Sequence, residues 1–231
     1  MRSEEEKALR AAGSTSASPL SPHPSRIYLA SRSPRRRELL KQAGIAFDLL
    51  LMRADRQRGV DVDEAPLAEE APVDYVMRIA SAKAAAGWRQ VVMRRLPAGP
   101  VLAADTTIVL EGDIVGKPDN AEHAQQILRL LSGRTHQVLT AIAVARGDHL
   151  EAALSTSAVE FRELEDGEIR RYVETGEPLD KAGAYAIQGR AAVFVRAISG
   201  SYSGIMGLPL YETAELLRRF NANLFFAPRP A

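Results

Sequence analysis

The sequence predicts an α/β or α+β fold, because strand-like and helix-like segments alternate along the chain and no internal repeat is evident. The chain has 231 residues and is 46% hydrophobic, which is enough for one large domain or for two lobes that share a core. Residues 1–26 are rich in Ser, Pro, Ala and charge, so we expect a disordered extension there. A flexible tail is expected over residues 223–231, which leaves residues 27–222 as the predicted domain.

The first strand and helix are predicted between residues 27 and 44. The apolar run Ile27–Ala30 has the pattern of a short buried strand. Ser33 is a good helix N-cap, Pro34 occupies the favoured first helical position, and Gly44 supplies the C-terminal stop.

Three arginines follow at the start of this helix. Arg35, Arg36 and Arg37 lie in the first turn, where the helix dipole already carries positive partial charge and each exposed cation costs roughly 0.3–1 kcal/mol. Free backbone N–H groups together with arginines form an anion site that suits phosphate. The alternative is a solvated basic turn. The context favours a phosphate site.

Residues 47–117 are predicted to contain three strands and a long helix. Val76, Ala80 and Lys83 fall on one face of that helix at a spacing of 3.6 residues. The elements are a strand over 47–52, a polar acidic loop over 53–70, the helix over 72–88, a strand over 101–110, a tight turn over 111–113 and a returning strand over 114–117.

Residues 119–220 continue the alternation. A capping box, Asp119-x-x-Glu122, opens a helix that stops near Gly133. Two glycine-rich segments, 183–189 and 199–207, are predicted to be loops, and loops on a rigid scaffold often carry sites. The remaining elements are strands over 136–145, 155–161 and 192–198 and helices over 166–174 and 209–220.

Composition excludes several classes of function. The 30 basic and 29 acidic residues give a net charge of +1, so there is no global basic field for nucleic acid. There is no cysteine, and the four histidines have no zinc-ligand spacing. No apolar run reaches membrane-spanning length and the N-terminus is too polar for a signal peptide, so we expect a cytoplasmic protein without a membrane partner. A Walker A loop and a dinucleotide fingerprint are both missing from the sequence.

Asp105 is a carboxylate inside an apolar strand, where desolvation is costly unless the group is paired or binds a metal. It is either a structural aspartate satisfied by local backbone or a general base or metal ligand. The turn at 111–113 folds Lys117 back opposite Thr106 or Ile108, depending on register, which would place an ammonium within a rung or two of Asp105. Such a lysine could hold a phosphate and lower the pKa of the acid.

Other candidates are weaker when each is taken alone. Lys83 lies on the apolar face of its helix, where lysines usually snorkel. Glu64, in an acidic loop, could bind a cation through a hard oxygen. Gln188 offers an amide that both donates and accepts, which suits the edge of a nucleobase. His136 is predicted to pack or cap at a strand start. Together these residues predict that the protein binds a nucleotide with several phosphates.

Six segments in order resemble the motifs of Maf nucleotide pyrophosphatases: LASRSPRRRELL, AADTTIVL, VGKP, LLSGRTHQV, EPLDKAGAYAIQG and GLPLYETAELL. The resemblance runs from about Ile27 to Phe220. It implies an α/β fold related to inosine triphosphate pyrophosphatases, with a long twisted mixed sheet, flanking helices and two lobes around a central cleft. It also implies a homodimer, and hydrolysis of a nucleoside triphosphate to the monophosphate and pyrophosphate with Mg²⁺ or Mn²⁺.

The resemblance also implies roles for individual residues. Asp105 would be the proton acceptor, and Glu64 together with Asp105 would help to hold the metal. Phosphate and sugar would contact Ser31, Arg35, Arg36, Lys83 and Lys117. Substrate choice would be tuned at Arg35, Thr106 and Gln188.

Two branches of the family differ in substrate. Thr106 and Gln188 resemble the dTTP/UTP branch, whereas the 7-methyl-GTP branch tends to show SDQ in place of Ala104-Asp105-Thr106. The alternative interpretation is a non-catalytic regulator of septum formation or cell division that binds nucleotide. An intact set of site residues favours an enzyme. A single-stranded nucleic-acid binder is disfavoured by the neutral charge and by only 6% aromatic residues.

Overall fold

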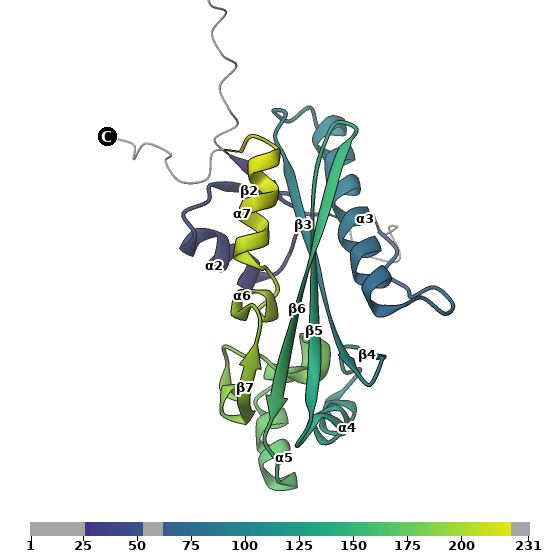
Figure 1. Ribbon diagram of the computed structural model, residues 1–231, viewed down its shortest axis with the longest axis vertical. Coiled ribbons are helices and arrows are strands. Elements are labelled where there is room, and N and C mark those ends of the chain that lie inside the picture. The colour runs from purple at the N-terminus through teal and green to yellow at the C-terminus, as the bar shows by residue number, and fades with distance from the viewer. Residues whose placement is uncertain (1–25, 53–61, 223–231) are drawn as a thin grey trace, which may run out of the picture.

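A computed structural model describes residues 26–52 and 62–222, so the predicted extension up to residue 25 and the predicted tail at 223–231 lie outside the described residues. The architecture is a seven-stranded mixed sheet with helices on both faces. Three long strands, β3 (Val101–Leu110), β5 (Thr135–Arg146) and β6 (His149–Phe161), run along the long axis of the molecule (Figure 1). The predicted α/β class and the long mixed sheet are therefore confirmed.

Four short strands complete the sheet. The strand order of the whole sheet is β2-β1-β3-β5-β6-β7, with β4 paired to β3. The β1–β2 and β1–β3 pairs are parallel and the other pairs are antiparallel. The short strands are β1 (Ile27–Leu29), β2 (Phe47–Leu49), β4 (Asp113–Val115) and β7 (Val195–Ser199).

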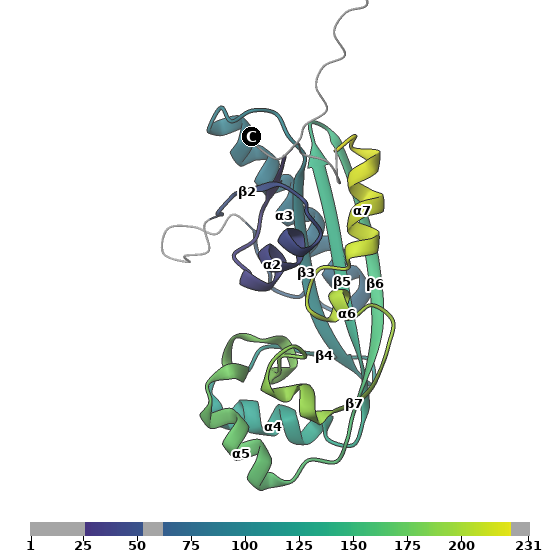
Figure 2. The same ribbon diagram turned by 90° about the vertical axis from the view of Figure 1, so that its left-hand side faces the viewer.

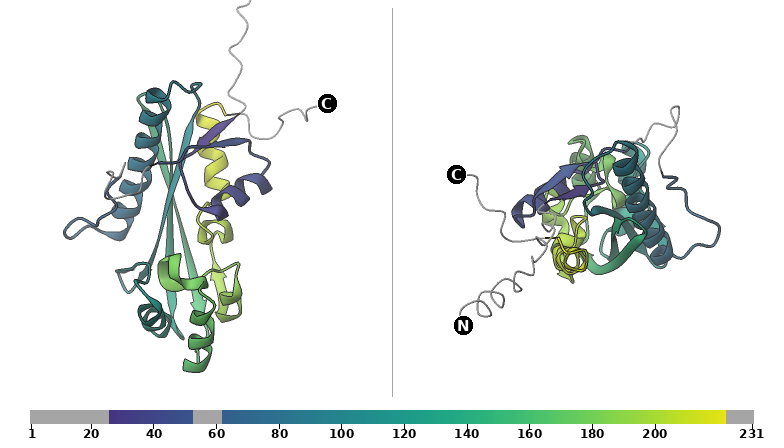
Figure 3. Two further views of the ribbon diagram at one scale, coloured as in Figure 1. Left: turned by 180° about the vertical axis from the view of Figure 1, so that it is seen from behind. Right: turned by 90° about the horizontal axis from the view of Figure 1, so that it is seen from above.

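The helices form two lobes around the long strands (Figure 2). In the upper lobe, α2 (Pro34–Gln42) and α7 (Leu210–Arg219) cover one face of the sheet, and α3 (Pro72–Met93) covers the other (Figure 3). The lower lobe contains α4 (Ala121–Leu131) and α5 (Asp166–Glu174). Among the strands of the described residues, only the long strands β3, β5 and β6 extend through both lobes (Figure 2).

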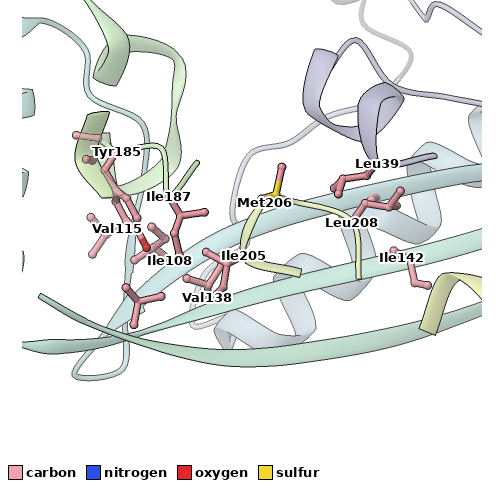
Figure 4. Close-up of a cluster of buried hydrophobic side chains, with 14 of the residues drawn as sticks. Leu39, Ile108, Val115, Val138, Ile142, Tyr185, Ile187, Ile205, Met206 and Leu208 are labelled. Atoms are coloured by element: carbon pink, nitrogen blue, oxygen red, sulfur yellow. The ribbon is translucent and has the colours of Figure 1, made fainter. Parts of the chain in front are cut away.

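Two hydrophobic clusters lie on opposite faces of the sheet, because successive side chains of a strand point to opposite sides. The larger cluster joins α2, α7 and the lower lobe through residues such as Leu39, Ile108, Val138 and Leu208 (Figure 4). The smaller cluster joins α3 to the other face and is rich in alanine and valine. Neighbouring residues of β3 therefore contact different helices.

The start of α2 follows the prediction closely. Ser33 caps the helix by accepting a hydrogen bond from the Arg36 N–H at 3.4 Å, and Pro34 is the first helical residue. Gly44 follows the C-cap with a positive φ of 68°, which favours glycine. The three arginines accordingly begin the helix.

Several boundaries differ from the prediction. The cap of α4 is Asn120, which accepts from the His123 N–H at 2.9 Å, while Asp119 contacts the His123 ring, so the predicted capping box is wrong. β6 begins at His149 rather than 155, and its first half pairs with β5. The predicted loop over 199–207 contains the short helix α6 (Tyr202–Ile205), and η2 (Ala182–Ala184) reaches into the predicted loop over 183–189. Two further short helices, η1 (Glu177–Asp180) and η3 (Arg190–Phe194), lie outside those loops, and η3 covers the start of the predicted strand over 192–198. The other differences concern where elements begin and end: β2 ends at residue 49, α3 extends to residue 93, β4 covers residues 113–115 and β7 covers residues 195–199.

Candidate active site

A gap in the sheet defines the candidate site. β1 pairs with Val101 and Leu102 at the start of β3, and β4 pairs with residues 108–110 at its end. β5 pairs along the whole opposite edge, so β1 and β4 share one edge. No strand among the described residues pairs with 103–107 on that edge. The open segment carries Asp105 and Thr106, and Ser31 lies just beyond the end of β1.

Asp105 points toward α3 and pairs with a lysine. The Lys83 Nζ lies 2.8 Å from Asp105 Oδ1 and 2.9 Å from Glu64 Oε1. The side chains of Asp105 and Lys83 are 12% and 14% exposed, whereas that of Glu64 is 55% exposed. The ammonium thus compensates a buried carboxylate and a more exposed one, so Lys83 is no snorkelling surface residue. Asp105 is not an aspartate satisfied by local backbone.

The segment that carries Glu64 is held against α3 by two residues that the sequence did not single out. The Tyr75 hydroxyl donates to the Glu64 carbonyl at 3.1 Å. Arg78 donates to both carboxylate oxygens of Glu70, at 2.5 and 2.6 Å, and to the Ala65 carbonyl at 3.1 Å. Burial raises the pKa of Tyr75, and the carboxylates of Asp105 and Glu64 raise it further. These contacts hold Glu64 and the residues that follow it against α3.

Arg36 lies on the other face of the sheet, at the first turn of α2. Its Nε donates to the Gly207 carbonyl at 2.7 Å, its Nη1 to Ser31 Oγ at 3.3 Å, and its Nη2 to Thr106 Oγ1 at 3.2 Å. Burial lowers the pKa of Arg36, while the charges of Asp105 and Glu64 act in the opposite direction. Those two carboxylates are thus near enough to interact with the guanidinium around the open edge of β3.

The remaining predicted site residues do not join these contacts. β4 ends at Val115, and the Gly116 carbonyl accepts from Gly183 N–H at 2.9 Å, so the chain leaves the ladder before Lys117. Lys117 is exposed and makes no ion pair with Asp105 in the part of the chain that the structure describes. The register excludes Ile108 as its partner, because Val115 takes that place.

Arg35 and Gln188 lie outside the Asp105 cluster. Burial raises the pKa of Asp180, but the hydrogen bond and charge of Lys181 and the charge of Arg35 outweigh it and lower this pKa, so Arg35 is close enough to interact with Asp180. Gln188 is exposed and follows η2. Neither side chain contacts the Asp105 cluster within residues 26–52 and 62–222, and the two are left free to meet a ligand.

A surface hollow elsewhere carries no candidate chemistry. It has a volume of about 460 Å³, lies beside α5 and is lined by Arg162, Glu163, Leu164, Glu165, Glu168 and Arg171. Arg162 there is neutralised by two hydrogen bonds to the Glu168 carboxylate, at 2.7 and 2.9 Å. The buried carboxylate, the two cations and the open sheet edge make the β3 site the stronger candidate.

The chemistry available at this edge is that of an anhydride hydrolase. Arg36 and Lys83 can bind phosphate oxygens, and Asp105 can accept a proton from water. No group of three or more acidic or histidine ligands occurs in the described residues, so a metal would find at most the carboxylates of Asp105 and Glu64. One or two carboxylates completed by substrate phosphates is the coordination typical of Mg²⁺.

The model of the family described as "Maf-like protein" matches residues 26–220. The chain belongs to the Maf family. Its Maf relatives include proteins named dTTP/UTP pyrophosphatase from three bacteria. The one from Aromatoleum aromaticum is 57% identical over 202 residues, covering 87% of this chain and 98% of the relative. The one from Nitrosomonas europaea is 54% identical (86% and 96% covered), and the one from Dechloromonas aromatica is 56% identical (84% and 96% covered).

A solved structure was also matched by this Maf chain. The Ham1 protein of Staphylococcus aureus is similar with a TM-score of 0.44 and 15% identity, over 84% of this chain and 97% of that one. No helix within the described ranges is both long and apolar enough to span a bilayer.

Proposed function

We propose that this protein hydrolyses dTTP and UTP to the nucleoside monophosphate and pyrophosphate. One observation carries the proposal: a buried carboxylate, Asp105, lies at an unpaired sheet edge between Lys83 on one face and Arg36 on the other. The names of the Maf relatives supply the substrate class.

Positive charge at the site binds the triphosphate. Arg36 is fixed by three hydrogen bonds, and its guanidinium retains two N–H groups for phosphate oxygens. Lys83 can turn from the carboxylates toward a phosphate when the substrate brings compensating charge. The side chains of Lys117 and Arg35, and the Arg35 backbone N–H at the start of α2, add to this field.

Asp105 orients and deprotonates the attacking water. The water oxygen bonds to the α-phosphorus, the bond from that phosphorus to the β-phosphate oxygen breaks, and the proton passes to an Asp105 oxygen. General-base assistance contributes about 10²- to 10⁴-fold. Stabilisation of the pyrophosphate leaving group by the cations adds a further electrostatic contribution.

Glu64 and Asp105 are the residues that fit a divalent cation, because both carboxylates reach one point that the Lys83 ammonium now marks. Mg²⁺ or Mn²⁺ bound there would neutralise phosphate charge and polarise the phosphorus centre. Glu64 is presented to this point by the Tyr75 and Arg78 contacts described above.

Base recognition is assigned to Gln188, which carries an amide that can match the O4 and N3–H edge of uracil or thymine. Arg35 and Thr106 complete the set of residues that tune substrate choice. The homodimer and the cytoplasmic location stay predictions.

A substrate panel tests the proposal. Pyrophosphate release is measured with dTTP, UTP, CTP, 7-methyl-GTP and ATP, with Mg²⁺ and with Mn²⁺, and the nucleotide product is identified. We expect monophosphate from dTTP and UTP at rates well above those with ATP and 7-methyl-GTP. Phosphate release, or equal rates with all five nucleotides, would contradict the proposed reaction or its specificity. Nucleotide binding without any turnover would instead favour the regulator.

Asp105→Asn tests the base assignment. Asparagine keeps the size of the side chain and can still accept from Lys83, but it cannot take a proton from water. Turnover is expected to fall about 10²- to 10⁴-fold while nucleotide affinity changes little. Asp166→Asn, at an exposed residue paired with Arg129 in the lower lobe, is the matched control and should keep the full rate. An Asp105→Asn enzyme that retains most of its turnover would show that another group is the base.

A further inference from the structure

Two threonines lie on one rung of the sheet beneath α6. Thr106 of β3 is directly opposite Thr140 of β5, and their Oγ1 atoms are 3.0 Å apart. Thr140 is fully buried, and its Oγ1 also lies 2.8 Å from the Gly204 carbonyl oxygen in α6. Buried polar groups are normally hydrogen-bonded, so these two neighbours are the hydrogen-bond partners of the Thr140 hydroxyl.

Thr140 connects Thr106 to α6. Its hydroxyl donates toward the Gly204 carbonyl at 2.8 Å and toward Thr106 Oγ1 at 3.0 Å. Arg36 Nη2 donates in turn to Thr106 Oγ1. The chain therefore runs from Arg36 through Thr106 and Thr140 to Gly204.

The chain closes on itself through α6. The Gly204 carbonyl also accepts from the Gly207 N–H at 2.8 Å, and the Gly207 carbonyl accepts from Arg36 Nε at 2.7 Å. The guanidinium is thus held at Nε and at Nη2 by the two ends of one hydrogen-bonded ring. Because the ring joins α2, β3, β5 and α6, it fixes Arg36 relative to the sheet edge that carries Asp105.

We propose that Thr140 is a positioning residue for the hydrolysis, acting on Arg36 through Thr106 without touching the substrate. The kinetic part of this inference rests on the proposed function. Thr106 Oγ1 accepts from Thr140 and from Arg36 Nη2, so Thr140 holds in place the oxygen to which Arg36 is bonded. Arg36 is in consequence presented in one orientation, with its two remaining N–H groups available for phosphate.

The test compares three variants. Thr140→Val keeps the shape of the side chain but removes the hydroxyl, and Thr140→Ser restores the hydroxyl without the methyl. Thr213→Val is the matched control, since Thr213 is also fully buried but its Oγ1 has no hydrogen-bond partner within the described residues. Each variant is measured for kcat and KM with dTTP and for thermal stability.

We expect kcat of Thr140→Val to fall about tenfold or more with a smaller change in KM, because small misplacements of a catalytic group are costly. Thr140→Ser should recover most of the rate and Thr213→Val should match the wild type. In an Arg36→Lys background, Thr140→Val should cost much less than in the wild type, because the group it positions is gone. Equal losses in both backgrounds, or no loss in Thr140→Val, would overturn the proposal.

A second readout does not depend on turnover. Solvent exchange of the Arg36 Nε–H, assigned in NMR spectra by its absence from Arg36→Lys, should be slow in the wild type and faster in Thr140→Val. If the wild type hydrolyses no dTTP but exchange is faster in Thr140→Val, the positioning role stands and only the proposed function is refuted. Unchanged exchange would refute the positioning role whatever the substrate.

Discussion

His136 gives this protein a predictable acid sensitivity. It is 1% exposed, its Nδ1 has no hydrogen-bond partner in the described residues, and its Nε2 lies 2.9 Å from the Tyr185 hydroxyl. The rings of Phe161 and Tyr185 meet it edge to face, with centroids 5.1 and 5.4 Å away. Burial lowers the pKa of His136 from 6.5 to about 4, because a charged ring would lose its hydration there.

The sign and size of the effect follow from linkage. The unfolded chain binds a proton at His136 below pH 6.5, whereas the folded chain does so only below about pH 4. Titration of His136 therefore leaves the free energy of unfolding unchanged above pH 6.5 and decreases it as the pH falls from 6.5 toward 4. At about 1.4 kcal/mol for each pH unit, the loss is about 2 kcal/mol at pH 5 and about 3 kcal/mol at pH 4.

The assay is the free energy of unfolding in urea between pH 7 and pH 4.5. His136→Gln removes the titrating group and leaves an amide for Tyr185. We expect the variant to be less stable than the wild type at pH 7 but to lose about 2 kcal/mol less between pH 7 and pH 5. His149→Gln, at a histidine whose side chain is 55% exposed, is the control and should keep the wild-type slope. Parallel profiles for His136→Gln and the wild type would refute the reasoning.

Two further substitutions test the placement of the site. Gly207 has a φ of 108°, and a Cβ there would lie 3.4 Å from Thr106 Oγ1 and 3.6 Å from Arg36 Nε. The substitution Gly207→Ala should therefore lower the free energy of unfolding by about 1–3 kcal/mol and should also lower kcat. Gly112→Ala, with a φ of 97° and open space around it, should lose stability alone, and an equal loss of kcat in both would refute the contact argument. Arg78→Gln should raise the Mg²⁺ concentration needed for half-maximal turnover several-fold, measured by Mg²⁺ titration, because the contacts that hold the segment of Glu64 are lost; an unchanged titration curve would contradict the role given to Glu64.

Local chemistry made part of this molecule predictable. Ser33, Pro34 and Gly44 begin and end α2 as expected, because a cap, a fixed φ and a left-handed residue act within one turn. Asp105 stood out because a lone carboxylate in a buried strand needs a partner. The same reasoning applied to Thr140, a polar residue within the apolar run of β5, could have drawn attention to it.

Other features depended on pairing between distant segments. Asp119 was a plausible cap, yet Asn120 took the role because the helix begins one residue later. Lys117 was expected beside Asp105, but β4 ends at Val115 and the chain turns toward Gly183 instead. α6 was hidden in a glycine-rich segment whose contacts with Arg36 are more than 160 residues away in sequence.

The sequence by itself determined the alternation of elements, the basic start of α2 and the isolated acid in β3, since each depends on neighbours a few residues away. Only the tertiary structure decided that β1 and β4 leave residues 103–107, within the described part of the chain, without a strand partner on the edge away from β5. That gap lets Lys83 approach from one face and Arg36 from the other, although adjacent residues of a strand point in opposite directions. Strand register and strand length are set by packing across the whole sheet, so no local pattern encodes where such an opening falls.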